Sequence, residues 1–291
     1  MSLNNLPDST QARDTTTPRD SASVVLLRDA AQGLQVLLMQ RSKRAAVLGG
    51  AYVFPGGKLE RSDSTAATLA QLDCPADTLR QALGEPLLDT PKAAGLFVAA
   101  IRETAEEVGV YLCDPWGDQP PAAASFSTWL RQPGSRLLTR ALAPWSRWIT
   151  PRHQTTIERR FDTRFFLAEL PAAQAARSDG FEATALRWLA PQEALQAYYR
   201  GEISLIPPQI ISLMHLSLYG SAGEAMQAAR EQAPPLIEPR LLKEDGQLAM
   251  CYPGDPMHPA DARAFPGMVP TRLLLRNGRF EPPGGTATPL P

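Results

Sequence analysis

Runs of apolar residues alternate with polar breaks along the chain and predict a mixture of strands and helices. Two runs rich in Val and Leu, at 22–29 and 34–42, flank a short break, so they predict a β-hairpin with its turn near Gly33. From Ala94 to Val108 apolar residues recur at helical spacing, and Gly109 follows where a helix takes a left-handed cap. Further strands are predicted at 144–150, 159–170 and 183–189, and further helices at 190–201, 207–220 and 222–232.

The stretch before the long predicted helix has a less regular hydrophobic pattern. Residues 64–93 carry only weak helical periodicity. Pro75, Gly84, Pro86 and Pro91 interrupt this periodicity, because proline and glycine break regular elements. The pattern therefore indicates a helical excursion that is inserted into the domain.

The two ends of the chain differ from its centre. Residues 1–20 are rich in Ser, Thr and Asp and favour a disordered tail. Beyond 235 the pattern predicts two hairpins, with turns at Asp245-Gly246 and Asn277-Gly278. A piece of about 55 residues is small for a core of its own. We therefore expect residues 236–291 to pack on a main domain that spans 21–235.

Charge and cysteine content narrow the class of protein. The 291 residues include 29 basic and 30 acidic side chains, which argues against nucleic acid or an anionic membrane as a partner and favours a small molecule. Cys74, Cys113 and Cys251 form no CxxC pair, which is typical of a reducing compartment. The start lacks an apolar secretory segment, and no run reaches the length of a membrane helix. The expected location is the cytoplasm.

Three carboxylates on the long predicted helix share one face. Glu103, Glu106 and Glu107 stand at i, i+3 and i+4, whereas Phe97, Ile101, Thr104 and Val108 form an apolar stripe on the opposite side. Hard oxygen ligands of this kind suit Mg²⁺ or Mn²⁺ shared with substrate phosphates. A solvated acidic face is the alternative.

A glycine turn offers a partner for that acidic face. Ala99 and Ala100 lie beside the glutamates and are small enough for another backbone segment to approach. Gly56-Gly57 is the expected segment, since glycine lets a backbone carbonyl or amide face a ligand. A plain turn is the alternative for this pair.

Together the two stretches resemble the Nudix box, G-x5-E-x7-R-E-U-x-E-E-x-G-U, in which U is a large aliphatic residue. Asp63 replaces the glutamate of its first half, Thr104 stands where an aliphatic residue is usual, and the remaining matches are Gly57, Arg102, Glu103, Glu106, Glu107, Gly109 and Val110. A long insertion separates Asp63 from Arg102, and its ends can still meet because loop-closure entropy grows slowly with length. The resemblance implies an α/β fold, namely the Nudix α/β/α sandwich with a mixed sheet, a helical insertion at 64–93 and a C-terminal hairpin extension.

The resemblance also implies a mechanism. Glu103, Glu106 and Glu107 would hold Mg²⁺ or Mn²⁺ with the carbonyl of Gly56, and Arg102 would orient the glutamates. A carboxylate would accept the proton of the attacking water, and two choices stay open for it, Glu106 and the loop residue Glu182. An ordinary surface acid is the alternative for Glu182.

Upstream residues point to one branch of the superfamily. They resemble the motif before the box in coenzyme A diphosphatases through Leu37, Leu38, Arg41, Ser42, Gly50 and Phe54, although Met39 and Ala46 depart from it. The long insertion is most similar to the branch that contains the peroxisomal coenzyme A diphosphatase. The sequence ends in Thr-Pro-Leu-Pro, so no peroxisomal address is expected. The expected substrate-binding residues are Arg41, Arg44, Phe54 and Gly57, with Arg159, Arg160 and Arg164 as further phosphate contacts unless they are surface charges.

The favoured activity is metal-dependent hydrolysis of coenzyme A or acyl-CoA to 3′,5′-ADP and a phosphopantetheine. An ADP-ribose or dinucleotide diphosphatase is one alternative. A non-catalytic Nudix-fold nucleotide sensor is another, although such modules tend to lose the glutamates that this chain keeps. The insertion could cover the mouth of the pocket or form the interface of a homodimer.

Overall fold

The computed structural model describes residues 17–43, 48–114, 126–151, 160–178, 180–244, 246–265, 267 and 270–285. Its strands are β1 (Arg19–Ala30), β2 (Gly33–Arg41), β3 (Tyr52–Val53), β4 (Gly56–Lys58), β5 (Cys113–Asp114), β6 (Arg136–Leu137), β7 (Ala143–Ile149), β8 (Phe161–Glu169), β9 (Ala183–Leu189), β10 (Leu236–Ile237), β11 (Arg240–Glu244), β12 (Gln247–Cys251), β13 (Arg272–Arg276) and β14 (Arg279–Glu281). Its helices are η1 (Arg61–Ser64), α1 (Ala66–Leu69), α2 (Ala76–Leu83), α3 (Thr90–Val108), α4 (Phe126–Leu130), η2 (Thr139–Ala141), α5 (Pro191–Arg200), α6 (Pro207–Leu216) and α7 (Ala222–Glu231).

The predicted hairpin forms the centre of a mixed sheet. β1 and β2 pair antiparallel around the turn before Gly33, which confirms the prediction. β1 also pairs parallel with β8, and the sheet runs in the order β10-β7-β8-β1-β2-β3, with β4 on β1 and β9 on β2. β1 begins at Arg19, so the last two residues of the predicted tail belong to a strand, while residues 1–16 lie outside the described part.

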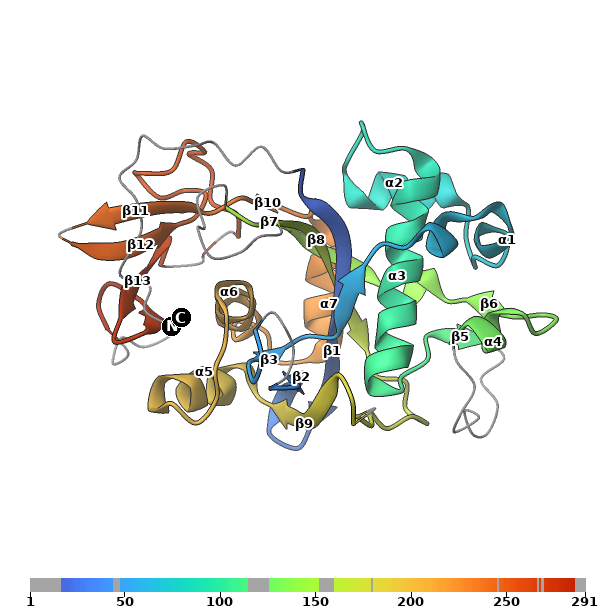
Figure 1. The fold of residues 1–291 in the computed structure, drawn as a ribbon, viewed down its shortest axis with the longest axis horizontal. Coiled ribbons are helices and arrows are strands. Elements are labelled where there is room, and N and C mark those ends of the chain that lie inside the picture. The colour runs from blue at the N-terminus through green and yellow to red at the C-terminus, as the bar shows by residue number, and fades with distance from the viewer. Residues whose placement is uncertain are drawn as a thin grey trace.

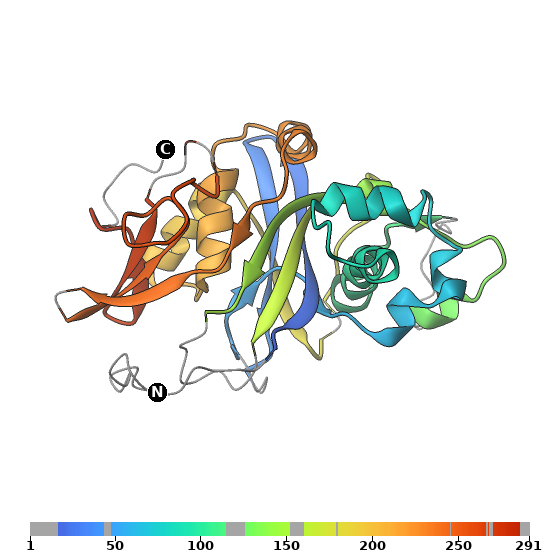
Figure 2. The same cartoon turned by 90° about the horizontal axis from the view of Figure 1, so that it is seen from above.

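Both faces of this sheet are apolar, because successive side chains of a strand point to opposite sides. Along β1, Val24 and Leu26 join one core cluster, whereas Val25 and Leu27 join the other. The first cluster includes α3, and the second includes α5, α6 and α7. Figure 1 shows α3 on one side of the sheet and α5 and α6 on the other, and Figure 2 shows the same layers from above. This arrangement confirms the α/β/α sandwich.

Helix α3 is the longest helix in the described part of the chain and is buried on most of its surface. Its end at Val108 and the left-handed cap at Gly109 confirm the prediction. Its start at Thr90 lies four residues before the predicted start. Pro91 is not a break here, because a proline in the first helical turn gives up only an N–H that has no intrahelical partner. Asp89 caps this end by accepting a hydrogen bond from the backbone N–H of Lys92 at 2.9 Å.

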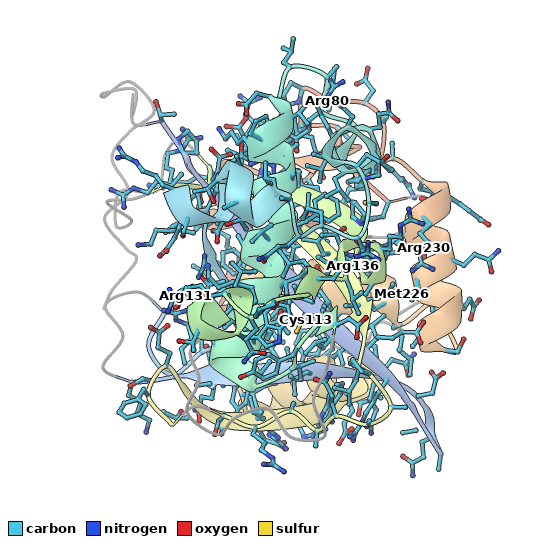
Figure 3. All side chains as sticks on the ribbon, turned by 90° about the vertical axis from the view of Figure 1, so that its right-hand side faces the viewer. Arg80, Cys113, Arg131, Arg136, Met226 and Arg230 are labelled. Carbon is cyan, nitrogen blue, oxygen red and sulfur yellow. The ribbon has the colours of Figure 1, made fainter. Side chains whose placement is uncertain are left out.

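The insertion follows η1 and folds into α1 and α2 against α3, and this outcome confirms its predicted helical character. Pro75 precedes α2 as its N-cap residue, and Gly84 ends α2 in the left-handed conformation. Thus two of the predicted breaks are helix boundaries. Figure 3 looks onto this side of the molecule, with Arg80 of α2 near one end of α3 and Met226 and Arg230 of α7 at the edge.

The C-terminal strands form a separate four-stranded antiparallel sheet in the order β11-β12-β13-β14. The second predicted hairpin turn is present, with positive φ at both Asn277 and Gly278. Asp245, in the first turn, lies outside the described residues. This sheet contacts the main body through aromatic rings, for example Trp148 and Tyr252 with centroids 5.9 Å apart. None of the helices described is both long enough and apolar enough to cross a membrane.

Candidate active site

The glycine turn and the acidic helix meet directly, although the insertion separates them in the sequence. The backbone N–H of Gly56 donates a hydrogen bond of 2.8 Å to the carboxylate of Glu107. The pairing of β4 with β1 holds the turn in place, with Gly56 opposite Ser23 and Gly57 opposite Ala22. The approach predicted from the small residues of α3 is therefore confirmed, and Ala99 and Ala100 are fully buried.

Both glycines of the turn approach neighbouring atoms closely, and at Gly56 these atoms belong to the backbone. A Cβ atom at Gly57 would overlap the carboxylate of Glu103. A Cβ atom at Gly56 would overlap the backbone carbonyl of Ala22 and would lie 2.7 Å from the Cα atom of Ser23. The absence of side chains at the turn therefore brings backbone and carboxylates into contact.

Arg102 organises the acidic face from a buried position. Its Nε donates to Asp63 at 3.0 Å and its Nη2 donates to the same carboxylate at 3.1 Å. Its Nη1 donates to Glu103 at 2.7 Å and to Glu106 at 3.1 Å. Nη2 also donates to the carbonyl of Lys58 at 3.0 Å. One guanidinium group thus joins the end of β4, the first half of the box and two glutamates of the second half.

The carboxylates of the site are in a desolvated environment that disfavours their charged forms. Burial, together with the nearby charge of Glu103, raises the pKa of Glu107 to about 8, although the Gly56 hydrogen bond opposes this shift. Burial also raises the pKa of Glu103 above its ordinary value, against the effect of Arg102. Glu106 is the exposed member of the set, with 42% of its side chain accessible. The site is therefore lined by one buried acid, Glu107, one half-buried acid, Glu103, and one exposed acid, Glu106.

Glu182 and Arg41, from outside α3 and the glycine turn, complete this environment. Glu182 lies within electrostatic range of Glu103 and Glu107 and helps to raise the pKa of both. Its backbone carbonyl accepts a hydrogen bond of 2.9 Å from the N–H of Ser42, so the two loops are joined. The positive charge of Arg41 acts on Glu107 in the opposite direction. Nε of Arg41 is buried and has no hydrogen-bond partner among the residues that the structure describes.

The chemistry of these side chains fits a divalent cation. Carboxylate oxygens are the ligands that Mg²⁺ and Mn²⁺ prefer, and a cation would offset the burial that raises the pKa of Glu103 and Glu107. Within the described ranges, however, no three acidic, histidine or cysteine side chains already converge as a metal-binding cluster. In this arrangement Glu106 contacts Arg102, and Glu107 contacts the Gly56 backbone.

Two other predicted contacts, Phe54 and Arg160, have partners elsewhere in the fold. The ring of Phe54 is only 3% exposed and packs in the core, with its centroid 6.3 Å from that of Phe165, so packing is the role that its position shows. Arg160 is buried and pairs with Glu238 at 3.2 Å. Arg44 and Arg159 lie outside the described residues.

Arg164 belongs to a buried charge network that the sequence did not predict. It is 2% exposed and forms two hydrogen bonds with Glu85, at 2.8 and 2.6 Å, which tie the insertion to β8. It also pairs with Asp20 of β1 at 2.6 Å, and Asp20 in turn pairs with Lys92 of α3 at 2.5 Å. A charged residue that directly precedes the apolar run Phe-Phe-Leu-Ala within β8 was the signal of a buried partner.

The sandwich, together with a glycine turn that meets a buried Arg102 and three glutamates across an insertion, defines an enzyme of the Nudix hydrolase class. A model of the NUDT19 Nudix domain matches residues 12–216, which is more than half of the chain. The chain therefore belongs to the NUDT19 Nudix family. This match confirms the resemblance to Nudix hydrolases that the sequence motifs indicated.

Relatives and solved structures agree with this assignment. The chain is 30% identical over 281 residues to a protein from Gallus gallus named acyl-coenzyme A diphosphatase NUDT19, with 78% of this chain and 73% of that protein covered. It is 29% identical to the protein of that name from Homo sapiens, with 83% and 76% covered. A crystal structure of a Nudix hydrolase from Alicyclobacillus acidocaldarius is similar with a TM-score of 0.58 and 28% identity, over 76% of this chain and 98% of that one.

Proposed function

We propose that this enzyme hydrolyses the diphosphate of coenzyme A or acyl-CoA to 3′,5′-ADP and the corresponding phosphopantetheine. The observation that carries the proposal is the contact of Gly56 with Glu107 beside the Arg102 hub, because it assembles the box despite the insertion. The names of the relatives from Gallus gallus and Homo sapiens, which match along most of the chain, supply the substrate class.

Mg²⁺ or Mn²⁺ is the proposed cofactor, held by Glu103, Glu106 and Glu107 with the carbonyl of Gly56. A bound divalent cation would neutralise phosphate oxygens and lower the pKa of a bound water. The exposed position of Glu106 leaves its carboxylate accessible to such a ligand, whereas Glu103 and Glu107 are anchored by Arg102 and by Gly56. Arg102 would keep the glutamates in position throughout turnover.

The reaction transfers a phosphoryl group to water. The water oxygen forms a bond to one phosphorus of the diphosphate, and the bond from that phosphorus to the bridging oxygen breaks. The bridging oxygen leaves with the second phosphate group. Glu106 or Glu182 accepts the proton of the water, since both carboxylates belong to the site. All atoms and protons of the hydrolysis are therefore accounted for by the diphosphate, one water molecule and the carboxylate that accepts the proton.

The substrate's negative charge requires a cationic partner beside the glutamates. Arg41 is suited to this role, because its Nε has no hydrogen-bond partner in the described part of the chain and its charge acts on Glu107. Arg44 follows shortly after it and is proposed as a second phosphate contact. Gly57, which packs against the carboxylate of Glu103, is proposed as a further substrate contact.

Product analysis tests the proposal. Purified enzyme with Mg²⁺ or Mn²⁺ is given coenzyme A, an acyl-CoA, ADP-ribose and NADH separately, and products are identified by chromatography. We expect 3′,5′-ADP from the first two and no turnover after chelation of the metal. Preferential cleavage of ADP-ribose or NADH would replace the substrate assignment, and no product from any compound would favour a nucleotide sensor.

Replacement of Glu106 separates chemistry from folding. Glu106→Gln should lower kcat by about 100-fold or more, in the range of a lost acid-base or ligand group, while the thermal midpoint changes little because this side chain is partly exposed. Glu193→Gln on the exposed side of α5 is the matched control and should retain full activity. A fully active Glu106→Gln enzyme would contradict the metal assignment.

A further inference from the structure

An apolar cavity lies between the C-terminal extension and the end of β7. Its volume is about 410 Å³, which falls within the roughly 300–1,000 Å³ of small-molecule sites. Proline and leucine side chains form most of its wall, namely Pro151, Leu236, Pro239, Leu241, Pro253 and Pro259. Leu236 is 50% exposed there. Apolar surface that folding has not buried is thus available to an apolar ligand.

The polar side chains that line the cavity are engaged with the protein itself. Glu238 pairs with Arg160 at 3.2 Å, and Nε2 of His258 donates to the backbone carbonyl of Glu238 at 3.0 Å. Nη1 of Arg240 donates to the backbone carbonyl of Met257 at 3.3 Å. Because these groups already have partners, the cavity suits a hydrocarbon better than a phosphate.

The loop that closes the cavity is held in a fixed shape. The N–H of Gly254 donates to the carbonyl of Ala260 at 2.8 Å. Inside this loop, Asp255 accepts hydrogen bonds from the N–H of Met257 at 2.9 Å and from Nε of Arg272 at 2.7 Å. Proline side chains in the wall have almost no rotamer entropy to lose. The cavity is therefore preorganised, which lowers the free-energy cost of binding.

The register of the sheet places this cavity in line with the acidic site. Ile237 of β10 lies opposite Trp148 of β7, which lies opposite Thr163 of β8. Thr163 in turn lies opposite Ser21 of β1, and Ser21 lies opposite Lys58 of β4. One continuous row thus crosses five strands. At about 4.8 Å for each step between strands, the ends of the row are about 19 Å apart.

This separation matches the length of the pantetheine arm. At one end of the row, Gly57 precedes Lys58 and packs against the carboxylate of Glu103, and at the other end Leu236 precedes Ile237 and lines the cavity. The arm has about 13 bonds from phosphate to sulfur and spans about 15 Å when extended, since three bonds of an extended chain span about 3.5 Å. A phosphate beside Glu103 therefore lets the sulfur stop just short of the cavity, and the acyl chain that follows the sulfur enters it.

We infer that this cavity is the binding site for the acyl chain of an acyl-CoA, so that the C-terminal extension sets the preference for acylated over free coenzyme A. The inference rests on the proposed function, which places the diphosphate at the glutamates. Each methylene group that leaves water for the apolar wall adds favourable free energy. Affinity for the pantetheine half should therefore rise when an acyl chain is attached.

Equilibrium binding tests the inference without turnover. Calorimetry compares 4′-phosphopantetheine with its S-octanoyl thioester in the presence of Mg²⁺, and neither compound contains a diphosphate that could be cleaved. The wild type should bind the octanoyl compound about 10- to 100-fold more tightly. Leu236→Asp places a charge in the wall, and Ala260→Trp fills the cavity. In both variants the octanoyl advantage should fall to a few-fold, while unchanged binding of 4′-phosphopantetheine shows that the fold is intact.

Leu87→Asp is the matched control, since Leu87 is fully exposed in the connection between α2 and α3. It should keep the whole octanoyl advantage, and an equal loss in this variant would overturn the inference. A wild type that binds neither compound or shows no octanoyl advantage would overturn it too. So would an advantage that survives in both Leu236→Asp and Ala260→Trp. Product analysis decides separately whether coenzyme A is cleaved, so an enzyme that cleaves it without an octanoyl advantage would refute this inference alone.

Discussion

Asp63 and Arg102 carry opposite charges at a place that solvent barely reaches. Their side chains are 2% and 10% exposed, and two hydrogen bonds join them. Burial alone would lower the pKa of Arg102, but its bonds to Asp63 and the charge of Glu103 raise that pKa overall, so the guanidinium stays charged. The shorter Asp, in place of the usual Glu of the box, still reaches the arginine because η1 holds it close to α3.

Asp63→Asn should therefore be costly, because it leaves the buried charge of Arg102 without its main partner. We expect the free energy of unfolding to fall by about 3 kcal/mol and kcat to fall as well, since Arg102 also positions Glu103 and Glu106. Denaturant unfolding and initial rates would measure both effects. Asp77→Asn on α2, where the side chain is 68% exposed, is the control and should change stability by less than about 0.5 kcal/mol. Equal stability of Asp63→Asn and Asp77→Asn would contradict the role of Asp63 as the main partner of buried Arg102.

At the scale of elements, α3 and η1 pack so closely at Gly95 that an added methyl group would displace neighbouring side chains. A Cβ atom at Gly95 would overlap Oγ of Ser64 and lie 3.1 Å from Cδ1 of Leu59. This contact connects the beginning of the insertion with its end. The two halves of the box are thus brought together by packing on either side of the inserted helices.

Gly95→Ala should push η1 away from α3 and lower the free energy of unfolding by about 1–3 kcal/mol. Adding Ser64→Ala removes the overlapping oxygen and should restore part of the loss. Gly223→Ala in α7 has open space around the added methyl group and should be neutral or slightly stabilising. Thermal unfolding of the wild type, the two single variants and the Gly95→Ala/Ser64→Ala double variant measures these differences in stability. A Gly95→Ala protein as stable as Gly223→Ala would contradict the close packing of η1 on α3.

The insertion is also fastened to the sheet by charge. Glu85 pairs with Arg164 of β8 and, at 2.9 Å, with Arg147 of β7. Glu85→Gln should increase backbone amide hydrogen exchange in α2 and destabilise the fold by at least about 1 kcal/mol, because Arg164 would lose a charged partner in a buried place. Exchange in α5, on the other face of the sheet, should stay unchanged. Equal hydrogen-exchange rates of α2 in the wild type and in Glu85→Gln would show that the pairing of Glu85 with Arg164 does not hold the insertion in place.

At the scale of the whole molecule, the C-terminal sheet and the main body share one core. His215 of α6 is 4% exposed and lies between Trp145 of β7 and Phe265, with ring centroids 4.7 and 4.1 Å away. Burial lowers its pKa from 6.5 to about 4. A neutral imidazole therefore belongs to the folded state at neutral pH.

This shift predicts a pH dependence of stability. Between pH 6.5 and 4 the unfolded chain binds a proton at His215 that the folded chain refuses, so the free energy of unfolding must fall as pH falls. From pH 7.5 to pH 5 this one group should remove about 2 kcal/mol. The raised pKa of Glu107 acts in the opposite direction. A comparison with His215→Leu cancels that effect, because Glu107 is common to both proteins. Denaturant unfolding at both pH values should show a smaller acid loss in His215→Leu, and equal losses would contradict the prediction.

Local patterns determined much of the fold and of the site. The periods of apolar residues predicted the β1–β2 hairpin, β7 to β9 and α5 to α7, because side-chain alternation and helical spacing are local properties. The cap at Gly109 and the identity of the box residues followed from the sequence for the same reason. The predicted start of α3 was four residues too late, and this error also had a local cause. Pro91 predicts a break in a helix unless it is known to lie in the first turn, where proline is tolerated.

Only the tertiary structure decided which charges are buried and what they contact. From the sequence alone Arg164 could be a surface charge, but in the fold β8, β1 and the insertion bury it. Phe54 is a core residue because Phe165 packs beside it. The raised pKa of Glu107 depends on the burial that the assembled site provides. These properties arise between segments far apart in the sequence, where desolvation and close packing exist only after the chain has folded.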